Sequence, residues 1–584
     1  MKAHKDWDQD LFELGKCYWQ VLDNLWQQGS GYWQGSGAEQ WAEAVNQANQ
    51  AWLGNPSGLF SLYNQWLEKQ QLLWQQTSQR LLGGQYQTVA EPRAGDQRFN
   101  HPQWQNHPVF DFIKQAYLIN SEYLDALFAQ LPELDPKVRQ QLQFNARQYI
   151  NALAPTNFPW SNPDVIEQTL ASGGKNLSEG LKRLAEDLEN SPLGLNLPMT
   201  DLNAFKLGEN IAATPGQVVF QNRLMQLIQY SPSTETVAKR PMLLVPPWIN
   251  KFYVLDLRPQ NSLIKYLVDQ GHTLFVISWV NPDADLCEVS FDDYMQEGPL
   301  AALEAIAQAT GEQEVNALGY CIGGTLLACT QAYLASKRSK RIASTTYLTT
   351  LLDFADPGEI GVFINEQSVA ALERQMQQLG YFDGRMMALG FNMLRENDLF
   401  WSFFITNYLK GELPPAFDLL YWNSDSTNLP AAMHGFYLRQ MYLENKLVQD
   451  ELKLAGRYIR LSRITAPSYF LATEKDHIAK WQACFQGARA HGGDKTFVLA
   501  GSGHIAGVIN PPEAQKYGYS TCADLELEPL AWQEAAERHN GSWWPHWQAW
   551  LTPLRGGEVP ARHPGDGELP VLEAAPGSYV RKRL

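Results

Sequence analysis

Gly319-Tyr320-Cys321-Ile322-Gly323-Gly324 lies where the sequence changes from the pattern of a strand to the pattern of a helix. Residues 314–318 alternate like a short strand, and residues 325–334 form an apolar run that predicts a buried helix. A Gly-x-nucleophile-x-Gly sequence in this position is typical of a sharp turn that presents a reactive side chain, because the glycines avoid collisions within the turn. The stretch therefore predicts a strand–turn–helix element with Cys321 at the turn.

Cys321 is the candidate nucleophile of this turn. A thiolate at a helix N-terminus is stabilised by the helix dipole and by the free N–H groups of the first turn, which lowers the pKa of the thiol and favours attack on a carbonyl carbon. The hexapeptide is also compatible with a tight turn that holds a buried, unreactive cysteine. Partner residues elsewhere in the chain have to decide between these two interpretations.

The composition is that of a large globular protein. Of the 584 residues, 45% are hydrophobic and 18% are charged, and the 20 tryptophans provide a large aromatic surface. The net charge of −16 argues against a general nucleic-acid-binding protein. The sequence contains no apolar run long enough to span a membrane, and the spacing of its 11 histidines predicts no metal site.

The cysteines indicate a reducing environment. All six are scattered, and they form no Cys-x-x-Cys pair. The first residues of the sequence also lack the apolar core of a secretory signal. Both observations predict a cytoplasmic protein.

The sequence pattern predicts four regions. Residues 1–95 are rich in Gln and Trp and are expected to form short helices, which either dock on a partner, a second copy or a granule surface, or pack as a helical layer on their own chain. Residues 96–235 are predicted to form a mostly helical N-terminal domain. Residues 236–554 are predicted to form the catalytic α/β domain, and residues 555–584 a Pro/Gly-rich C-terminal tail that extends as an arm.

Apolar strands alternate with helical segments in the third region, which indicates a parallel sheet covered on both faces. The predicted strands up to the middle of the region span residues 241–247, 273–279, 314–318 and 343–352. Residues 353–462 interrupt the alternation with aromatic, helical sequence that includes Trp401-Ser402-Phe403-Phe404. We expect this insertion to form a cap over the site.

Two later strands lead to residues that suit catalysis. The apolar run 468–472 leads to Asp476, and the run 496–500 leads to His504. Because loops at the carboxyl ends of parallel strands gather at one edge of a sheet, both side chains are predicted to converge with Cys321. The order nucleophile, acid, histidine is the one that α/β-hydrolases use. We expect His504 to deprotonate or pair with Cys321, and Asp476 to orient the imidazole.

Other residues are candidates for the acid and the base. Asp353 and Asp356 follow an earlier strand and could supply the acid, but their sequence also resembles a turn that leads into the cap, so Asp476 is favoured. His477 could act as the base, although it is equally compatible with the start of a helix. The glycine-flanked loop of His504 suits a catalytic histidine better.

An oxyanion hole in such a fold uses two backbone N–H groups. One belongs to the residue after the nucleophile, here Ile322, and the other to the loop after an earlier strand, here Trp248-Ile249-Asn250, with Ile249 as the candidate. The Pro-Pro pair before this loop is also compatible with a simple turn.

Six motifs carry a resemblance to a known family: Pro246-Pro247-Trp248-Ile249-Asn250-Lys251, Gly319-Tyr320-Cys321-Ile322-Gly323-Gly324, Leu351-Leu352-Asp353-Phe354, Trp422-Asn423-Ser424-Asp425, Asp476-His477-Ile478-Ala479 and Gly503-His504-Ile505-Ala506-Gly507. Over most of residues 95–584 the chain resembles class I polyhydroxyalkanoate synthases, also called poly(3-hydroxyalkanoate) polymerases. The resemblance implies an α/β-hydrolase fold with an inserted cap subdomain and a mostly helical N-terminal domain. It also implies that Cys321, Asp476 and His504 are the catalytic residues.

The resemblance further implies an acyltransferase that polymerises (R)-3-hydroxyacyl-CoA into polyhydroxyalkanoate, releasing CoA through a thioester on Cys321. No cofactor is expected, because CoA is carried by the substrate. The expected partners are the substrate, the growing polyester, the granule surface with its associated proteins, and a second copy in a homodimer, but neither nucleic acid nor a membrane span. The expected location is the cytoplasm, at polyhydroxyalkanoate granules.

A cysteine suits this chemistry, because exchange of one thioester for another keeps the acyl group activated for ester formation. An aromatic cap would then protect the intermediate from water. The alternative function is a thioesterase or dienelactone-type hydrolase on the same fold, which would use the same triad with water as the acceptor. A third hypothesis is a non-enzymatic granule scaffold, and the intact set of Cys, Asp and His argues against it.

Overall fold

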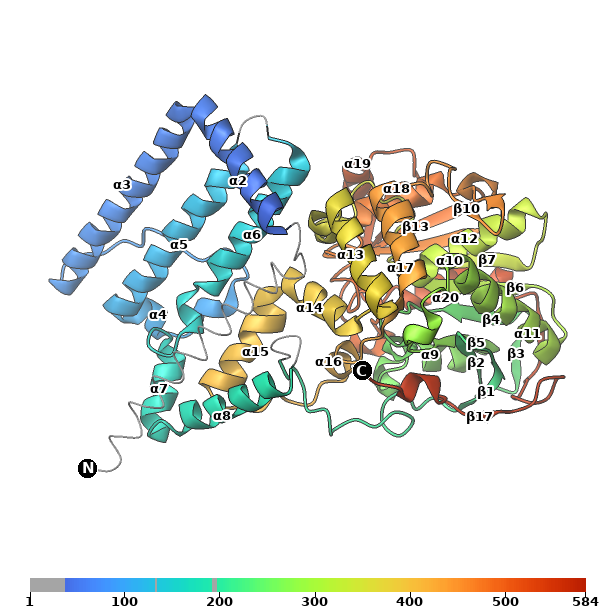
Figure 1. The fold of residues 1–584 in the computed structure, drawn as a ribbon. Helices are drawn as coiled ribbons and strands as arrows, with labels where there is room; N and C mark the ends of the chain where they lie inside the picture. Colours follow the sequence, from blue (N-terminus) through green and yellow to red (C-terminus); the bar gives the residue numbers. More distant parts are fainter. Residues whose placement is uncertain (1–36, 132–133, 192–196) are drawn as a thin grey trace. The chain divides into compact units, whose positions relative to one another are not determined.

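The computed structural model describes residues 37–131, 134–191 and 197–584, with side chains from residue 42 onward (Figure 1). These residues form two compact units. The helical unit contains the described residues up to Asp201 together with Leu389–Pro415, and the α/β unit contains Leu202–Ala388 and Ala416–Leu584. None of the described helices is long and apolar enough to cross a membrane.

The α/β unit is built on a mixed sheet of eleven strands in the order β15-β14-β13-β12-β7-β6-β4-β5-β2-β1-β17. The strands are β1 (Gly216–Gln221), β2 (Met225–Tyr230), β4 (Met242–Val245), β5 (Leu274–Trp279), β6 (Val315–Tyr320), β7 (Ile342–Leu348), β12 (Ser468–Thr473), β13 (Lys495–Ala500), β14 (Tyr519–Thr521), β15 (Glu537–His539) and β17 (Glu573–Ala574). The six strands from β5 to β13 run parallel. All residues of β4, β5, β6 and β12 are buried, as expected for parallel strands covered on both faces.

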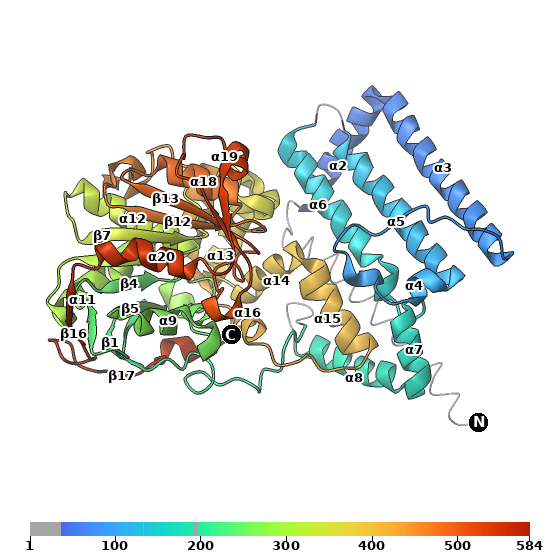
Figure 2. The same ribbon diagram turned by 180° about the vertical axis from the view of Figure 1, so that it is seen from behind.

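Helices cover both faces of this sheet. Adjacent residues of a strand point to opposite faces. In β7, the Thr345 hydroxyl donates to Gln331 on α12 (Ile322–Ser336), while the Thr346 hydroxyl accepts from the Trp547 indole on α20 (Trp544–Leu551), so α12 and α20 lie on opposite sides. In Figure 2, α20 and α9 (Leu263–Asp269) lie in front of the strands, and both contribute to the apolar cluster on that face. The predicted α/β-hydrolase fold is confirmed.

The remaining described elements of the α/β unit belong mainly to the insertion and to short connections. The helices of the insertion in this unit are α13 (Glu366–Leu379), α16 (Asp418–Asn423), α17 (Ala431–Phe436) and the π-helix η10 (Tyr437–Leu443). The helix α14 (Gly384–Leu394) begins in this unit and ends in the helical unit. On the sheet, α11 (Ala301–Thr310) precedes β6, and α18 (Trp481–Ala490) connects β12 to β13. This alternation of strand and helix produces the parallel core.

The helical unit contains α2 (Gly37–Gly54), α3 (Pro56–Leu81), α5 (Pro108–Ala129), α6 (Pro136–Ala152), α7 (Pro163–Ser172) and α8 (Lys175–Glu189) (Figure 1). The buried Trp52 donates its indole N–H to the Leu127 carbonyl at 3.1 Å, and Trp66 on α3 donates to Asn120 on α5 at 2.8 Å. The described part of the Gln- and Trp-rich region thus packs as a layer on its own chain, while Trp74 remains 61% exposed. Trp7, Trp19, Trp26, Trp33 and the side chain of Trp41 lie outside the described part, and the docking role stays a prediction.

The predicted cap at 353–462 is divided between the two units. Its central part, Leu389–Pro415, folds into the helical unit as η8 (Asn397–Trp401), α15 (Ser402–Phe404) and η9 (Ile405–Leu409). The physical reason is apolar burial, because Trp401 and Phe404 pack in one cluster with Val165 and Leu184 of the N-terminal helices. The Trp401–Phe404 stretch is therefore part of the core of the helical unit.

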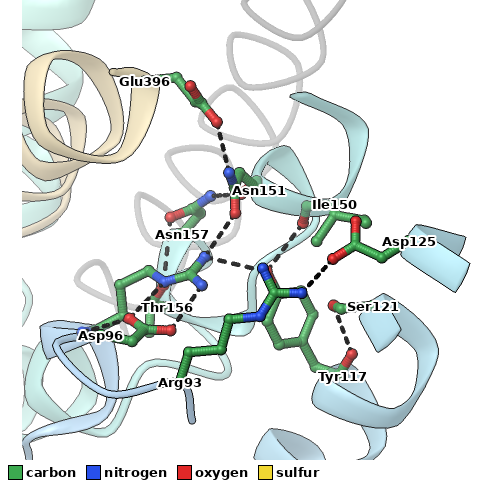
Figure 3. Close-up of polar contacts among 11 residues, drawn as sticks. Arg93, Asp96, Tyr117, Ser121, Asp125, Ile150, Asn151, Thr156, Asn157 and Glu396 are labelled. Carbon is green, nitrogen blue, oxygen red and sulfur yellow. Dashed lines mark hydrogen bonds and ion pairs between the residues drawn. The ribbon is translucent and has the colours of Figure 1, made fainter. Parts of the chain in front are cut away.

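A buried network of hydrogen bonds and ion pairs holds Glu396, which belongs to the segment Leu389–Pro415 (Figure 3). The Glu396 carboxylate accepts a hydrogen bond from Asn151 Nδ2 at 2.5 Å, as Figure 3 shows. The same carboxylate lies 3.3 Å from Nε of Arg147. Asn151 Oδ1 in turn accepts from Arg98, which also donates to Asp96 at 2.8 Å. Because a buried carboxylate without partners is strongly unfavourable, this network requires Glu396 to remain in the helical unit.

Two predicted domain boundaries differ from the boundaries that the structure shows. β1 and β2 already belong to the sheet, so the α/β unit begins at Leu202 and not at residue 236. The tail at 555–584 is no extended arm, because β16 (Glu558–Pro560) pairs with β3 (Thr236–Ala238) and β17 pairs with β1. Pairing with β17 satisfies backbone groups that an edge strand would otherwise leave open.

We predict that Gly180→Ala destabilises the helical unit. A Cβ atom at this position would lie 1.9 Å from the carbonyl oxygen of Tyr408, so α8 and η9 would have to separate. The expected loss is about 1–3 kcal/mol, as for other overpacked sites, and it outweighs the higher helix propensity of alanine. Urea unfolding followed by circular dichroism measures it. The matched control is Lys182→Ala on the exposed side of α8, and equal stability of the two variants would contradict the close packing.

Candidate active site

Cys321 lies at the sharp turn between β6 and α12, as predicted. Its backbone adopts φ 53° and ψ −127°, a conformation that side-chain-bearing residues rarely take and that persists only where the surroundings enforce it. A Cβ atom on Gly319 would lie 2.5 Å from the Gly324 Cα atom, and one on Gly323 would lie 2.3 Å from the Val245 carbonyl oxygen. Glycine is therefore required on both sides of Cys321.

His504 and Asp476 form a buried pair beside this turn. The Nδ1 atom of His504 lies 2.7 Å from Oδ2 of Asp476. The other carboxylate oxygen of Asp476 accepts from the N–H groups of Ile478 and Ala479, both at 2.9 Å, which fixes its orientation. His504 also interacts with the Cys321 side chain, so the three predicted residues are brought together. With Nδ1 bonded to Asp476, Nε2 is the nitrogen left for the thiol.

The pKa of His504 is raised well above 6.5. Burial alone would lower this pKa, but the negative charges of Asp476 and Cys321 and the hydrogen bonds to both side chains act in the opposite direction and outweigh burial. The imidazole is thus held in its protonated form next to the sulfur. A protonated imidazole in this position can give its proton to a leaving group.

The competing residues serve other contacts. Asp353 accepts hydrogen bonds from the N–H of Ala355 and from the side chain of Asn445, and Asp356 forms an ion pair with Lys480 at 2.9 Å. Both contacts fit the alternative interpretation of this stretch as a turn into the insertion. Of the carboxylates weighed as the acid, Asp476 is the one hydrogen-bonded to His504. The carbonyl oxygen of His477 accepts from the N–H of Glu359.

The two predicted oxyanion donors lie on adjacent elements. Ile322 is the first residue of α12, where N–H groups have no partner within the helix. Ile249 lies in the loop after β4, which pairs with β6 so that Val245 is opposite Gly319. A Cβ atom on Gly323 would also lie 2.5 Å from the Pro246 carbonyl oxygen, so this loop starts in contact with the first turn of α12. The oxyanion role of both N–H groups stays a prediction.

Sequence reasoning missed two tyrosines near the sulfur. Tyr437 and Tyr442 lie on the π-helix η10, and Phe354 packs edge-on against both rings. Burial raises the pKa of each phenol, and the charge of Cys321 contributes further. The i→i+5 bonding of a π-helix brings residues five apart toward one face. In the sequence, the two tyrosines are marked only by their separation of five residues. Residues five apart do not lie on the same face of an α-helix, so an α-helical pattern does not bring them together.

Within the described ranges, no group of three or more His, Cys, Asp and Glu residues is placed to hold a metal ion. The five described cysteines, at positions 287, 321, 329, 484 and 522, are free thiols. Burial strongly raises the pKa of the Cys329 and Cys484 thiols, which disfavours the reactive thiolate form at both positions.

Comparison with known proteins identifies the family. Residues 95–267 match the family described as Poly-beta-hydroxybutyrate polymerase (PhaC) N-terminus, and residues 240–511 match the alpha/beta hydrolase fold family. The chain is 46% identical over 546 residues to the poly(3-hydroxyalkanoate) polymerase of Methylorubrum extorquens, across 93% of this chain and 90% of the relative. The chain belongs to the poly(3-hydroxyalkanoate) polymerase family.

Two further poly(3-hydroxyalkanoate) polymerases support the assignment. Subunit PhaC of Rhizobium meliloti is 47% identical over 541 residues, across 93% of this chain and 88% of the relative. Subunit PhaC of Cupriavidus necator is 40% identical over 512 residues, across 85% and 86%. The predicted family and enzyme class, a polyhydroxyalkanoate synthase, are confirmed.

We predict a pH-dependent contribution of His504 to stability. A histidine whose folded-state pKa is raised above the unfolded value stabilises the folded protein fully below pH 6.5, and this contribution is lost as pH rises through the folded-state pKa. ¹³C NMR of histidine-labelled protein should show His504 titrating above 6.5. Asp476→Asn should shift this titration to lower pH, whereas the control Asp353→Asn should leave it in place. An unshifted titration in Asp476→Asn would show that this carboxylate does not hold the proton.

Proposed function

We propose that the chain transfers (R)-3-hydroxyacyl groups from CoA to the end of a growing polyester, through a thioester on Cys321. The observation that supports this proposal is the arrangement of Cys321 at a strained turn beside His504, which is hydrogen-bonded to Asp476. The curated relatives that match most of the chain are named poly(3-hydroxyalkanoate) polymerases. Family membership suggests the product, and the geometry suggests the mechanism.

The first half-reaction acylates the cysteine. The Cys321 thiolate attacks the thioester carbonyl of the substrate, and the N–H groups of Ile322 and Ile249 stabilise the negative charge on the oxygen. The bond from the carbonyl carbon to the CoA sulfur then breaks, and His504 gives its proton to the departing thiolate. CoA leaves as the free thiol, Cys321 carries the acyl group, and the imidazole is neutral.

The second half-reaction forms the ester. The hydroxyl of another 3-hydroxyacyl group attacks the Cys321 thioester, and the neutral imidazole of His504 accepts the hydroxyl proton. The carbon–sulfur bond breaks, which releases the lengthened ester and restores the thiolate and the imidazolium. Asp476 holds the imidazole in one orientation and stabilises its positive charge in both halves.

The surroundings of Cys321 favour transfer to a hydroxyl over hydrolysis. Tyr437, Tyr442 and Phe354 contribute aromatic surface near the sulfur, and such a lining limits the access of water to a reactive intermediate. A thioester intermediate also retains the activation that ester formation requires. The proposed reaction needs no cofactor, since the substrate supplies the CoA leaving group.

We further propose the partners and location that follow from this reaction. They are the CoA substrate, the growing polyester with its granule surface and associated proteins, and a second copy of the chain in a homodimer, in the cytoplasm. On α3, Phe60 and Trp74 are 65% and 61% exposed, and an exposed aromatic surface suits contact with a polyester or a protein partner.

One assay tests the function. Purified protein is mixed with (R)-3-hydroxybutyryl-CoA while thiol release and turbidity are followed together, and we expect both to rise. Cys321→Ser is expected to remain folded and to lose more than about nine-tenths of the rate, because a serine hydroxyl has a far higher pKa than a thiol. Thiol release with soluble hydroxyacid and no turbidity would indicate a thioesterase or another hydrolase instead. Full activity of the serine variant would remove Cys321 from the mechanism.

A second pair of variants tests the assignment of the acid. Asp476→Asn is expected to reduce turnover by about 10³–10⁴-fold, as loss of the orienting carboxylate does in related triads. The matched control is Asp353→Asn, which removes a carboxylate that lies in a turn and is expected to keep most of the activity. Steady-state CoA release by both variants, normalised to folded protein, gives the comparison. A larger effect of Asp353→Asn would reverse the assignment.

A further inference from the structure

The loop Pro246–Lys251 connects β4 to the region that follows, and it is held at both ends. At its start, the Pro246 carbonyl accepts from the indole of Trp279 at 2.9 Å and lies against Gly323 of α12. At its end, the Lys251 carbonyl accepts from the indole of Trp422 at 2.7 Å. Ile249, the candidate oxyanion donor, lies between these two anchors.

The side chain of Lys251 is buried, with only 2% exposed. Its ammonium group donates to the carbonyl oxygens of Val580 and Lys582, both at 2.7 Å, and lies 3.1 Å from Oδ1 of Asp425. The two hydrogen-bond acceptors and the ion-pair partner of this ammonium group come from two segments far away in the sequence. Lys251 therefore joins the loop to the insertion at Asp425 and to the segment Tyr579–Arg583.

Asp425 is the centre of this ion cluster, which we define as Lys251, Asp425 and Arg583. The carboxylate is fully buried, accepts from the hydroxyl of Tyr253 at 2.8 Å, and lies 3.4 Å from Nε of Arg583. The guanidinium group of Arg583 also stacks over the ring of Tyr421, 4.5 Å from its centroid. Two cations thus share one buried carboxylate.

Thr427 fixes the orientation of the peptide group that contains the Ile249 N–H. Its hydroxyl donates to the carbonyl oxygen of Trp248, and its backbone N–H donates to the carbonyl oxygen of Ile249 at 3.1 Å. In a trans peptide the C=O and N–H bonds point in opposite directions. Because the Trp248 carbonyl points to Thr427, the N–H of Ile249 is directed away from Thr427 and is not used in that contact.

Stability alone does not explain this arrangement. Burial lowers the pKa of Lys251, and the nearby Asp425 acts in the opposite direction. A well-packed set of apolar side chains is often at least as stabilising as a buried ion pair. Charged hydrogen bonds, in contrast, are directional and restrict a loop to one geometry.

We propose that the ion cluster and Thr427 position the Pro246–Lys251 loop, so that the N–H of Ile249 faces the oxygen of the reacting thioester. Lys251, Asp425, Arg583 and Thr427 are then positioning residues, which act on the substrate only through the backbone of the loop. The inference rests on the proposed function, because it assigns the oxyanion hole of that acyl transfer.

Lys251→Met and Thr427→Val test the inference in the full-length chain. Lys251→Met keeps the buried stem but removes the charge, and Thr427→Val keeps the shape but removes the hydroxyl. The matched control is Arg581→Ala, which removes an exposed cation of the same segment that contacts Leu207 and not the loop. Thr427→Ser restores the hydroxyl and should recover the wild-type rate.

The measurement is the first turnover of (R)-3-hydroxybutyryl-CoA, which gives a rate constant for CoA release and a burst amplitude. We expect the rate constant to fall about ten- to a hundredfold in both variants, as misplaced catalytic groups produce, with KM little changed because the oxyanion contact forms only during reaction. The burst amplitude and the rate of Cys321 alkylation by iodoacetamide should stay at wild-type values, because neither reports on the oxyanion contact.

Two results would overturn the inference. One is a wild-type rate constant in folded Thr427→Val and Lys251→Met. The other is a lower burst amplitude or melting temperature with an unchanged rate constant, which would mean that these residues only stabilise the fold. If Lys251→Met does not fold, Thr427→Val and its serine rescue still decide the question. If the wild-type protein releases no CoA, the proposed function itself fails, and this result differs from a defect limited to the variants.

Discussion

The strained, positive-φ backbone conformation of Cys321 is the constraint on which the rest of the site depends. It is maintained by close packing around the turn, because a side chain at Gly323 would collide with the backbone of Val245 and Pro246. A side chain at Gly319 would collide with the backbone of Gly324, and one at Gly324 would collide with the side chain of Thr350. In this conformation the sulfur leaves the sheet at the carboxyl ends of the parallel strands, where the loops after β12 and β13 carry Asp476 and His504. The burial of the sheet therefore provides the rigidity that a strained residue needs.

Local sequence patterns were sufficient to predict this part of the molecule. The strands around Cys321 are short apolar runs bounded by turns, and each matches an observed strand within a few residues. The convergence of Cys321, Asp476 and His504 followed from one rule, that parallel strands present their carboxyl ends at the same edge. Asp476 could be preferred over Asp353 as the acid because the sequence around Asp353 is typical of a turn. The structure shows this turn, in which the Asp353 carboxylate accepts from the N–H of Ala355.

Contacts between distant segments could not be predicted in the same way. Residues 389–415 carry aromatic sequence that fits a cap as well as a helical core, and only the partners supplied by α7 and α8 decide the outcome. The segment after residue 555 contains many Pro and Gly residues, which indicated an arm, yet Lys251 and β1 use its backbone groups as partners. Backbone carbonyl groups are present in every sequence, so their use as ligands for a lysine leaves no pattern to detect.

The division of the insertion between two units has a consequence for synthesis of the chain on the ribosome. The helical unit takes its residues from two separate parts of the sequence, and Phe400, Trp401 and Phe404 complete its apolar cluster. The N-terminal helices therefore cannot bury this cluster until the ribosome has passed Pro415, when most of the central strands have already emerged. Until then, α7 and α8 lack these apolar partners, whereas the cluster around Trp52 and Leu142 is built from N-terminal residues alone. One half of the helical unit can therefore form early in synthesis, and the other half has to wait for a segment that follows β7.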